Sequence, residues 1–90
     1  MKTTNEIGGK YLIYSKSGCI YCDAAMDLLD KKQIVYKEVK IDNNDDEKKF
    51  LKSQGFRTVP QIYNDFGEHV GGYTELKEYF ESGEYLKWRY

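Results

Sequence analysis

Two cysteines, Cys19 and Cys22, lie in the segment Lys16-Ser17-Gly18-Cys19-Ile20-Tyr21-Cys22. A short apolar stretch at residues 11–14 precedes this segment, and a helical pattern at residues 24–29 follows it. A strand that leads through a cysteine pair into a helix is typical of a redox site rather than of a packed core. The segment therefore predicts a strand, a loop and a helix that present two reactive thiols.

Cys19 is predicted to be the attacking thiolate. It stands at the N-terminus of the predicted helix, where unpaired N–H groups carry about half a positive charge. The nearby ammonium group of Lys16 adds a full positive charge, and both effects lower the pKa of the Cys19 thiol. Cys22 lies one turn further along the same face, close enough to form a disulfide with Cys19. We infer a dithiol that exchanges with disulfides.

The composition is that of a small and nearly neutral chain. It has 90 residues, a formal net charge of -1 and a pI near 5.8. We expect one domain, residues 1–90, that binds neither nucleic acid nor a membrane. The start of the chain lacks an apolar run of signal-peptide length, so a cytoplasmic location is predicted. In that compartment, two cysteines indicate catalysis or metal binding rather than a structural disulfide.

A zinc site is the alternative to a redox role for the cysteine pair. Structural zinc usually takes four ligands, and the chain offers two cysteines and one histidine, His69. His69 falls in a predicted hairpin strand, where we expect it to be exposed. We therefore predict no metal site.

Strand and helix patterns follow one another along the chain. The predicted strands are residues 10–15, 34–41, 61–64 and 68–70, and the predicted helices are residues 19–32, 44–54 and 73–83. Residues 1–9 are expected to be a polar lead-in, and the apolar residues 84–90 are expected to pack back on the domain.

The order of these elements predicts the topology. The initial β-α-β unit requires a parallel strand pair with a right-handed crossover, and the later hairpin adds antiparallel strands. The second strand contains Lys37 and Lys40, and lysines are typical of edge strands, so we expect this strand at the edge of the sheet. The order β-α-β-α-β-β-α predicts an α/β thioredoxin fold with a four-stranded mixed sheet flanked by three helices.

Three motifs together give the chain a family resemblance. Cys19-Ile20-Tyr21-Cys22 follows Lys16, Thr58-Val59-Pro60 lies in the middle, and Gly71-Gly72 precedes the last helix. With these motifs in this order, nearly the whole chain resembles the short dithiol glutaredoxins of bacteria and their phages. The resemblance implies a glutathione-dependent thiol–disulfide oxidoreductase. The first cysteine would attack disulfides, and the second would resolve the mixed disulfide that forms.

The resemblance also implies a binding site for glutathione. Lys16, Gln54 and Arg57 would pair with its glycine carboxylate. The N–H groups of Thr74 and Glu75 would receive its γ-glutamyl carboxylate at a helix N-terminus. The complete implied set is Lys16, Tyr21, Gln54, Arg57, Thr58, Val59, Pro60, Gly72, Thr74 and Glu75.

Pro60 is the only proline of the chain, and the resemblance implies that its peptide bond is cis. A cis bond here would turn the backbone of Val59 towards an extended peptide such as glutathione. Plainer interpretations stay open for these residues. Pro60 could simply begin a strand, Gly71-Gly72 could be a turn, and Tyr21 and the charged residues could be ordinary surface groups.

Two residues depart from the usual glutaredoxin pattern. Ile20 stands where the commonest dithiol members have proline, which frees a backbone N–H near Cys19 and is expected to shift the reduction potential. Losing that proline also removes a feature thought to oppose iron–sulfur binding. Glu75 stands where many members have an aspartate that pairs with the γ-glutamyl ammonium, so the charge is kept but the geometry differs.

The resemblance further implies the partners of the reaction. No bound cofactor is required, glutathione is a co-substrate, and glutathione reductase with NADPH recharges the protein. Disulfide-containing proteins would be its substrates, with ribonucleotide reductase a natural client, and a monomer is expected. Two alternatives stay open. One is a thioredoxin-type reductant recharged by thioredoxin reductase, although the chain lacks Trp-Cys-Gly-Pro-Cys. The other is a dimer that carries a [2Fe–2S] cluster with glutathione.

Overall fold

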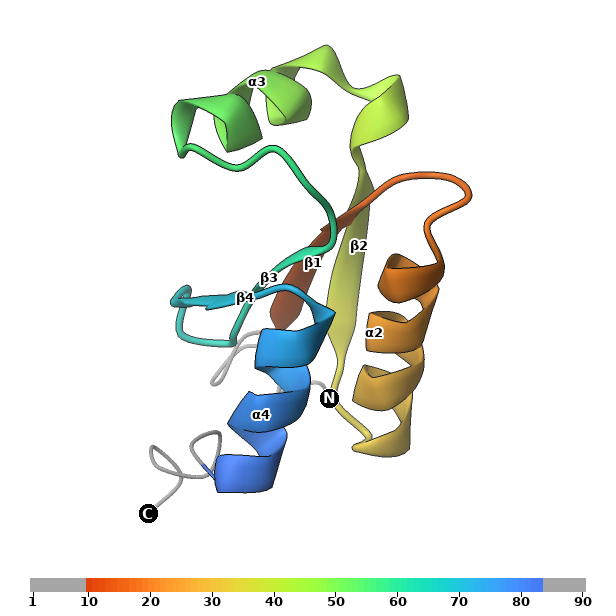
Figure 1. The fold of residues 1–90 in the computed structure, drawn as a ribbon, viewed down its shortest axis with the longest axis vertical. Helices are drawn as coiled ribbons and strands as arrows, with labels where there is room; N and C mark the ends of the chain where they lie inside the picture. The colour runs from red at the N-terminus through yellow and green to blue at the C-terminus, as the bar shows by residue number, and fades with distance from the viewer. Residues whose placement is uncertain (1–9, 84–90) are drawn as a thin grey trace, which may run out of the picture.

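A computed structural model describes residues 10–83, which form four strands, three α-helices and one short 3₁₀ helix (Figure 1). In chain order the elements are β1 (Tyr11–Ser15), α2 (Ile20–Lys31), β2 (Tyr36–Lys40), η1 (Ile41–Asn43), α3 (Asp45–Ser53), β3 (Gln61–Tyr63), β4 (His69–Gly71) and α4 (Tyr73–Ser82). All seven predicted strands and helices are confirmed. The predictions for residues 1–9 and 84–90 lie outside the described residues.

Three details differ from the prediction. Strand β2, predicted at residues 34–41, is shorter and spans Tyr36–Lys40. The 3₁₀ helix η1 was not predicted, because three residues are too few to show a helical period. Strand β4, predicted at residues 68–70, begins one residue later and extends through Gly71. Asn44 is the N-cap residue of α3, because its side-chain oxygen accepts a hydrogen bond from the N–H of Glu47 at 3.2 Å.

The four strands form one mixed sheet in the order β2-β1-β3-β4. Strand β1 pairs in parallel with β2 through the α2 crossover, and it pairs antiparallel with β3. Strand β3 then pairs antiparallel with β4 in the hairpin. Strand β2, with Lys37 and Lys40, lies at the edge as predicted. This arrangement is the thioredoxin fold.

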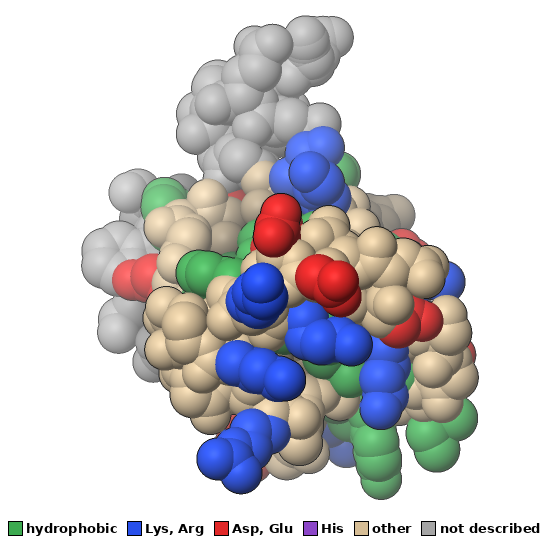
Figure 2. Space-filling model, turned by 90° about the horizontal axis from the view of Figure 1, so that it is seen from above, with side chains coloured by type: hydrophobic (Ala, Val, Ile, Leu, Met, Phe, Trp, Pro, Cys, Tyr) green, Lys and Arg blue, Asp and Glu red, His purple; other side chains and the backbone are tan. Residues whose placement is uncertain are grey.

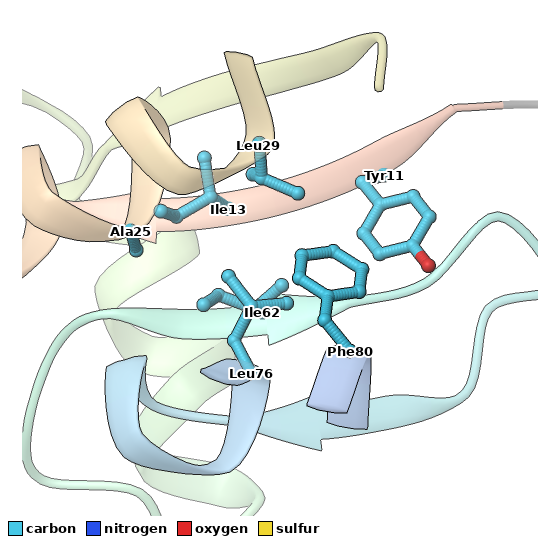
Figure 3. Close-up of a cluster of buried hydrophobic side chains, with 7 residues drawn as sticks. All are labelled: Tyr11, Ile13, Ala25, Leu29, Ile62, Leu76 and Phe80. Atoms are coloured by element: carbon cyan, nitrogen blue, oxygen red, sulfur yellow. The ribbon is translucent and has the colours of Figure 1, made fainter. Parts of the chain in front are cut away.

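The hydrophobic core lies between one face of the sheet and the helices α2 and α4, which run side by side in Figure 1. Figure 3 shows its members, which are Tyr11, Ile13, Ala25, Leu29, Ile62, Leu76 and Phe80. Five of them, from β1, β3, α2 and α4, are completely buried. The four large aliphatic side chains among these five each contribute about 1.5–3 kcal/mol. The core therefore fixes α2, and the cysteines at its start, against the sheet.

Helix α3 lies away from α2 and α4, beyond the end of the sheet where β1 leads into the cysteine loop (Figure 1). Phe50 of α3 packs against Tyr14 of β1, with ring centroids 6.0 Å apart, and the ring of Tyr63 meets Tyr14 edge-on. The contact between Phe50 and Tyr14 holds α3 against the sheet. Within residues 10–83, no helix is both long and apolar enough to span a bilayer.

Candidate active site

Cys19 and Cys22 form a disulfide at the N-terminus of α2, with their Cα atoms 5.2 Å apart. Cys19 is the N-cap residue of the helix, and its Sγ accepts a hydrogen bond from the backbone N–H of Cys22 at 3.1 Å. The Cys22 side chain is completely buried, whereas Cys19 is partly exposed. An outside molecule therefore reaches the sulfur of Cys19 first, and a helix N–H already points at that sulfur to stabilise negative charge.

The loop before β3 lies directly beside Cys19. Its Val59–Pro60 peptide bond is cis, as predicted. The carbonyl oxygen of Val59 lies 3.8 Å from Sγ of Cys19, although the two residues are 40 positions apart in the sequence. The backbone of Val59 is thus placed next to the reactive sulfur.

Two hollows open on either side of this loop and share Thr58 and Val59 in their walls. The first, which we call the lysine hollow, has a volume of about 760 Å³ and is lined by Lys16, Lys48, Lys52, Arg57, Thr58 and Val59 among others. The second, which we call the glycine hollow, has a volume of about 510 Å³ and is lined by Tyr21, Thr58, Val59, Pro60, Gly72, Thr74 and Glu75 among others. Together they form a path past Val59 that an extended peptide could follow.

The structure brings together nine of the ten residues predicted to bind glutathione. Lys16 and Arg57 lie in the lysine hollow, and the other seven line the glycine hollow, two of them shared. Gln54 lines neither hollow. It is exposed at the C-terminus of α3, where its backbone N–H bonds to carbonyl groups of the last helical turn.

Glu75 is already engaged in the N-terminus of α4. Its Oε1 accepts a hydrogen bond from the N–H of Gly72 at 2.8 Å, which is one half of a capping box. The side chain also folds over Gly71, whose φ is +127° and where an added Cβ would lie only 2.7 Å from Cβ of Glu75. Glycine at position 71 therefore leaves room for the Glu75 side chain to lie against the backbone. The other N–H groups in the first turn of α4 have no partner within the helix.

A hydrogen-bonded chain behind the Val59 loop was not predicted from the sequence. Nε2 of His69 lies 2.7 Å from Oε1 of Gln61, and Nε2 of Gln61 donates to the carbonyl oxygen of Thr58 at 3.0 Å. Since the Gln61 amide nitrogen faces a carbonyl, its oxygen must face His69, which makes Nε2 of His69 the donor. The ring of His69 also stacks on Phe56 at 4.4 Å between centroids. His69 is exposed, as expected, but it is tied to the loop beside Cys19.

Asp42 of η1 ties the cysteine loop to the lysine hollow. Its Oδ2 accepts a hydrogen bond from the backbone N–H of Ser17 at 3.3 Å. Hydrogen bonding from the Ser17 side chain, then from its backbone, together with the charge of Lys40, lowers the pKa of the Asp42 carboxyl group. Sequence reasoning had no signal for this contact, because it joins loops 25 positions apart. Within residues 10–83, no cluster of three His, Cys, Asp or Glu side chains could hold a metal ion.

Comparison with known proteins agrees with this geometry. The family model for glutaredoxins matches residues 12–70. The chain belongs to the glutaredoxin family. Glutaredoxin 1 of Rickettsia prowazekii is 43% identical over 68 residues, which cover 72% of this chain and 70% of that protein. The resemblance found in the sequence is thereby confirmed, and so is the class of protein, an oxidoreductase with a Cys19-x-x-Cys22 pair.

Solved glutaredoxin structures also resemble this member of the family. The crystal structure of glutaredoxin 1 from Francisella tularensis complexed with cacodylate has a TM-score of 0.70 and 34% identity, covering 81% of this chain and 93% of that one. The crystal structure of a buckwheat glutaredoxin–glutathione complex has a TM-score of 0.74 and 27% identity, covering 87% of this chain and 74% of that one.

Proposed function

We propose that the protein is a glutathione-dependent thiol–disulfide oxidoreductase that reduces glutathione mixed disulfides and protein disulfides. The observation that carries this proposal is the position of Cys19. Its sulfur is accessible at the N-terminus of α2, receives the N–H of Cys22, and lies 3.8 Å from the carbonyl oxygen of Val59. A peptide backbone that pairs with Val59 would bring its own sulfur to Cys19.

In the first reaction, the substrate is a thiol that carries glutathione. The Cys19 thiolate attacks the glutathione sulfur, a Cys19–glutathione disulfide forms, and the substrate leaves as a thiolate that takes up a proton. A second glutathione thiolate then attacks the bound glutathione sulfur, which gives oxidised glutathione and restores the Cys19 thiolate. The net result is that one free glutathione is consumed, one substrate thiol is released, and the glutathione carried by the substrate becomes the other half of oxidised glutathione. Glutathione reductase then reduces oxidised glutathione to two glutathione molecules with two electrons from NADPH.

In the second reaction, the substrate is a protein disulfide. Cys19 forms a mixed disulfide with one substrate sulfur, and the other substrate sulfur leaves as a thiol. The Cys22 thiolate then attacks Sγ of Cys19, which frees the second substrate thiol and leaves the Cys19–Cys22 disulfide seen here. Because Cys22 is completely buried, its role is restricted to this internal step.

The two hollows support the binding of glutathione in an extended form across Val59. Lys16 and Arg57 would meet the glycine carboxylate at one end. At the other end, the N–H groups of Thr74 and Glu75 would receive the γ-glutamyl carboxylate at the start of α4. One oxygen of the Glu75 carboxylate bonds to Gly72, so its second oxygen would meet the γ-glutamyl ammonium. The buckwheat structure, a complex with glutathione, supports this arrangement by analogy.

The proposal extends to the partners and the location of the reaction. It places the protein in the cytoplasm, where glutathione and glutathione reductase keep thiols reduced. Protein disulfides, including that of a ribonucleotide reductase, are the proposed physiological substrates. The protein acts as a monomer, and no bound metal or organic cofactor takes part in either reaction.

The test is turnover of a small glutathione mixed disulfide, followed as NADPH consumption with glutathione and glutathione reductase. A parallel assay uses thioredoxin reductase without glutathione. We expect activity in the first assay and loss of that activity in Cys19→Ser. In Cys22→Ser, reduction of the small mixed disulfide should persist while reduction of protein disulfides is lost. Activity with thioredoxin reductase alone would overturn the proposed dependence on glutathione.

A further inference from the structure

The lysine hollow contains more positive charge than the proposed glutathione site uses. Glutathione has a single carboxylate at its glycine end, and Lys16 with Arg57 suffices for it. Lys48 and Lys52 of α3 line the same hollow and have exposed side chains. Of these four cations, none has a carboxylate partner within 4.0 Å in the described residues, where an ion pair joins Lys31 to Asp27 on α2 instead.

The charges of α3 are not arranged merely to stabilise the helix. Its first turn is acidic, and lysines follow, which suits the helix dipole. The dipole, however, does not determine which side of the helix a lysine occupies. Lys48 and Lys52, four positions apart, both face the hollow, whereas Lys49 between them does not line it. Figure 2 views the molecule from the end at which α3 lies in Figure 1, and it shows Lys and Arg side chains gathered there with acidic side chains beside them.

The floor of the lysine hollow is apolar and continues to the active site. Leu51 lies at its base and is 3% exposed, and Ile41 and Phe56 contribute to its wall. Val59, whose carbonyl oxygen lies 3.8 Å from the Cys19 sulfur, forms the end nearest the disulfide. A substrate peptide that passes over Val59 to reach Cys19 can therefore continue into the lysine hollow. Its apolar atoms would contact the floor of the hollow, and its charged groups would lie at the rim.

The spacing of the two lysines predicts a pattern in the chain that binds there. Helical residues four apart are separated by about 6 Å along the axis. Alternate residues of an extended peptide are about 6.6 Å apart and point to the same side. Two acidic side chains with one residue between them would thus match Lys48 and Lys52.

We infer that the lysine hollow is a docking site for an acidic segment of the protein substrate, next to its disulfide. The segment is extended and carries two carboxylates in an acid-x-acid pattern that pair with Lys48 and Lys52. This inference rests on the proposed function, because it identifies which protein disulfides the enzyme reduces fastest. A nucleic acid fits less well, since the Asp42 carboxylate also lines the hollow and would repel a continuous phosphate backbone.

The experiment measures single-turnover reduction of synthetic peptides that contain an internal disulfide. The pre-reduced protein transfers two electrons, so that the Cys19–Cys22 disulfide forms as the peptide becomes a dithiol. One peptide series carries Glu-Ser-Glu on either side of its cystine with spacers of one to four residues, and a matched series carries Gln-Ser-Gln. Acid quenching, alkylation and mass spectrometry give the second-order rate constants at about 20 mM and 500 mM salt, where screening differs strongly.

We expect the wild-type protein to reduce one or more acidic peptides about fivefold to tenfold faster than their neutral matches at low salt, and equally fast at high salt. The ratio should fall below about twofold in Lys48→Gln/Lys52→Gln. It should persist in Lys49→Gln/Lys77→Gln, which removes the same charge from exposed lysines that do not line the hollow. In Lys48→Glu/Lys52→Glu the preference should reverse towards a Lys-Ser-Lys series. Circular dichroism melting checks that each variant folds.

The outcomes separate this inference from the proposed function. Equal rates for acidic and neutral peptides at every spacing in the wild type would overturn the docking site and leave the oxidoreductase standing. If Lys48→Gln/Lys52→Gln still reduced acidic peptides faster than neutral ones, the docking site would also be overturned. Tighter binding of a single-stranded oligonucleotide than of the acidic peptide at these two lysines would overturn it as well. No reduction of any peptide would overturn the oxidoreductase proposal itself.

Discussion

The side-chain amide of Gln61 donates a hydrogen bond at 3.0 Å to the carbonyl oxygen of Thr58, three residues earlier in the loop beside Cys19. Gln61 is 7% exposed, and its amide oxygen accepts a hydrogen bond from His69. The loop backbone that faces the reactive sulfur is therefore held from behind by a buried side chain of β3. Gln61 is a positioning residue in this arrangement, since it contacts the loop and not the sulfur.

Gln61→Met should weaken substrate binding more than it slows chemistry. Methionine fills a similar volume but leaves the Thr58 carbonyl without its partner, which costs about 1–3 kcal/mol at a buried group. We expect KM for a small glutathione mixed disulfide to rise about threefold or more, with kcat within about twofold. His69→Phe keeps the stacking on Phe56 and leaves Gln61 free to hold Thr58, so its effect should be smaller. A larger increase in KM in His69→Phe than in Gln61→Met would contradict the positioning role of Gln61.

Gly71→Ala should destabilise the protein more than Gly67→Ala. Both glycines have positive φ, +127° and +80°, so alanine is strained at each position, at a cost of about 1–3 kcal/mol. At position 71 the new Cβ would also meet the Glu75 side chain at 2.7 Å, whereas at position 67 nothing lies within 4 Å. Urea denaturation would measure the difference. Equal losses would show that Glu75 can move aside without cost.

Cys19 should ionise well below the ordinary cysteine range. The N–H of Cys22 and the helix N-terminus both favour the thiolate at this sulfur, so its pKa should lie below the ordinary cysteine value of about 8.5. In Cys22→Ser, where Cys19 is the only thiol, thiolate absorbance near 240 nm against pH would report it directly. Lys16→Gln in that background should raise the pKa, because it removes a nearby positive charge. A midpoint near 8.5 would contradict the assigned role of the helix.

Asp42→Asn should alter the pH dependence of stability. Hydrogen bonds from Ser17 lower the pKa of the Asp42 carboxyl group below its ordinary value of 3.8. A lowered pKa in the folded state means that the ionised group stabilises the protein above about pH 4, and that this contribution disappears as the pH falls further. Asp42→Asn should thus be less stable than the wild type at pH 6, and this difference in stability should become smaller at pH 3. The midpoints of urea denaturation of both proteins at pH 6 and pH 3 would measure the difference.

Ser17→Ala provides the control for Asp42→Asn. It removes the hydroxyl that most strongly lowers the Asp42 pKa but keeps the backbone N–H bond at 3.3 Å. We expect Ser17→Ala to be less stable than the wild type at pH 6, and we expect this difference in stability to become smaller at pH 3, as for Asp42→Asn. If Ser17→Ala kept the full pH dependence of the wild type, the assigned cause of the Asp42 shift would be wrong.

The prediction of the fold succeeded because its signals are local. Alternating apolar residues, the helical period after Cys19 and the asparagine cap at Asn44 each act within a few residues of one another. The β-α-β order then permits few topologies, and the parallel pairing of β1 with β2 follows from it. The 3₁₀ helix η1 escaped prediction because it is shorter than one period of any pattern.

The chemistry of the site was likewise present in the linear sequence, whereas its arrangement was not. The cysteine spacing and the helical pattern after it were enough to predict that Cys19 stands at the helix N-terminus, because both act within one helical turn. The contact of Val59 with Cys19, the support of Thr58 by Gln61, and the shared hollow of Lys16 and Lys48 join residues from separate elements. These distances depend on strand pairing and helix packing, which no local pattern contains, and so the folded chain alone brings these groups together.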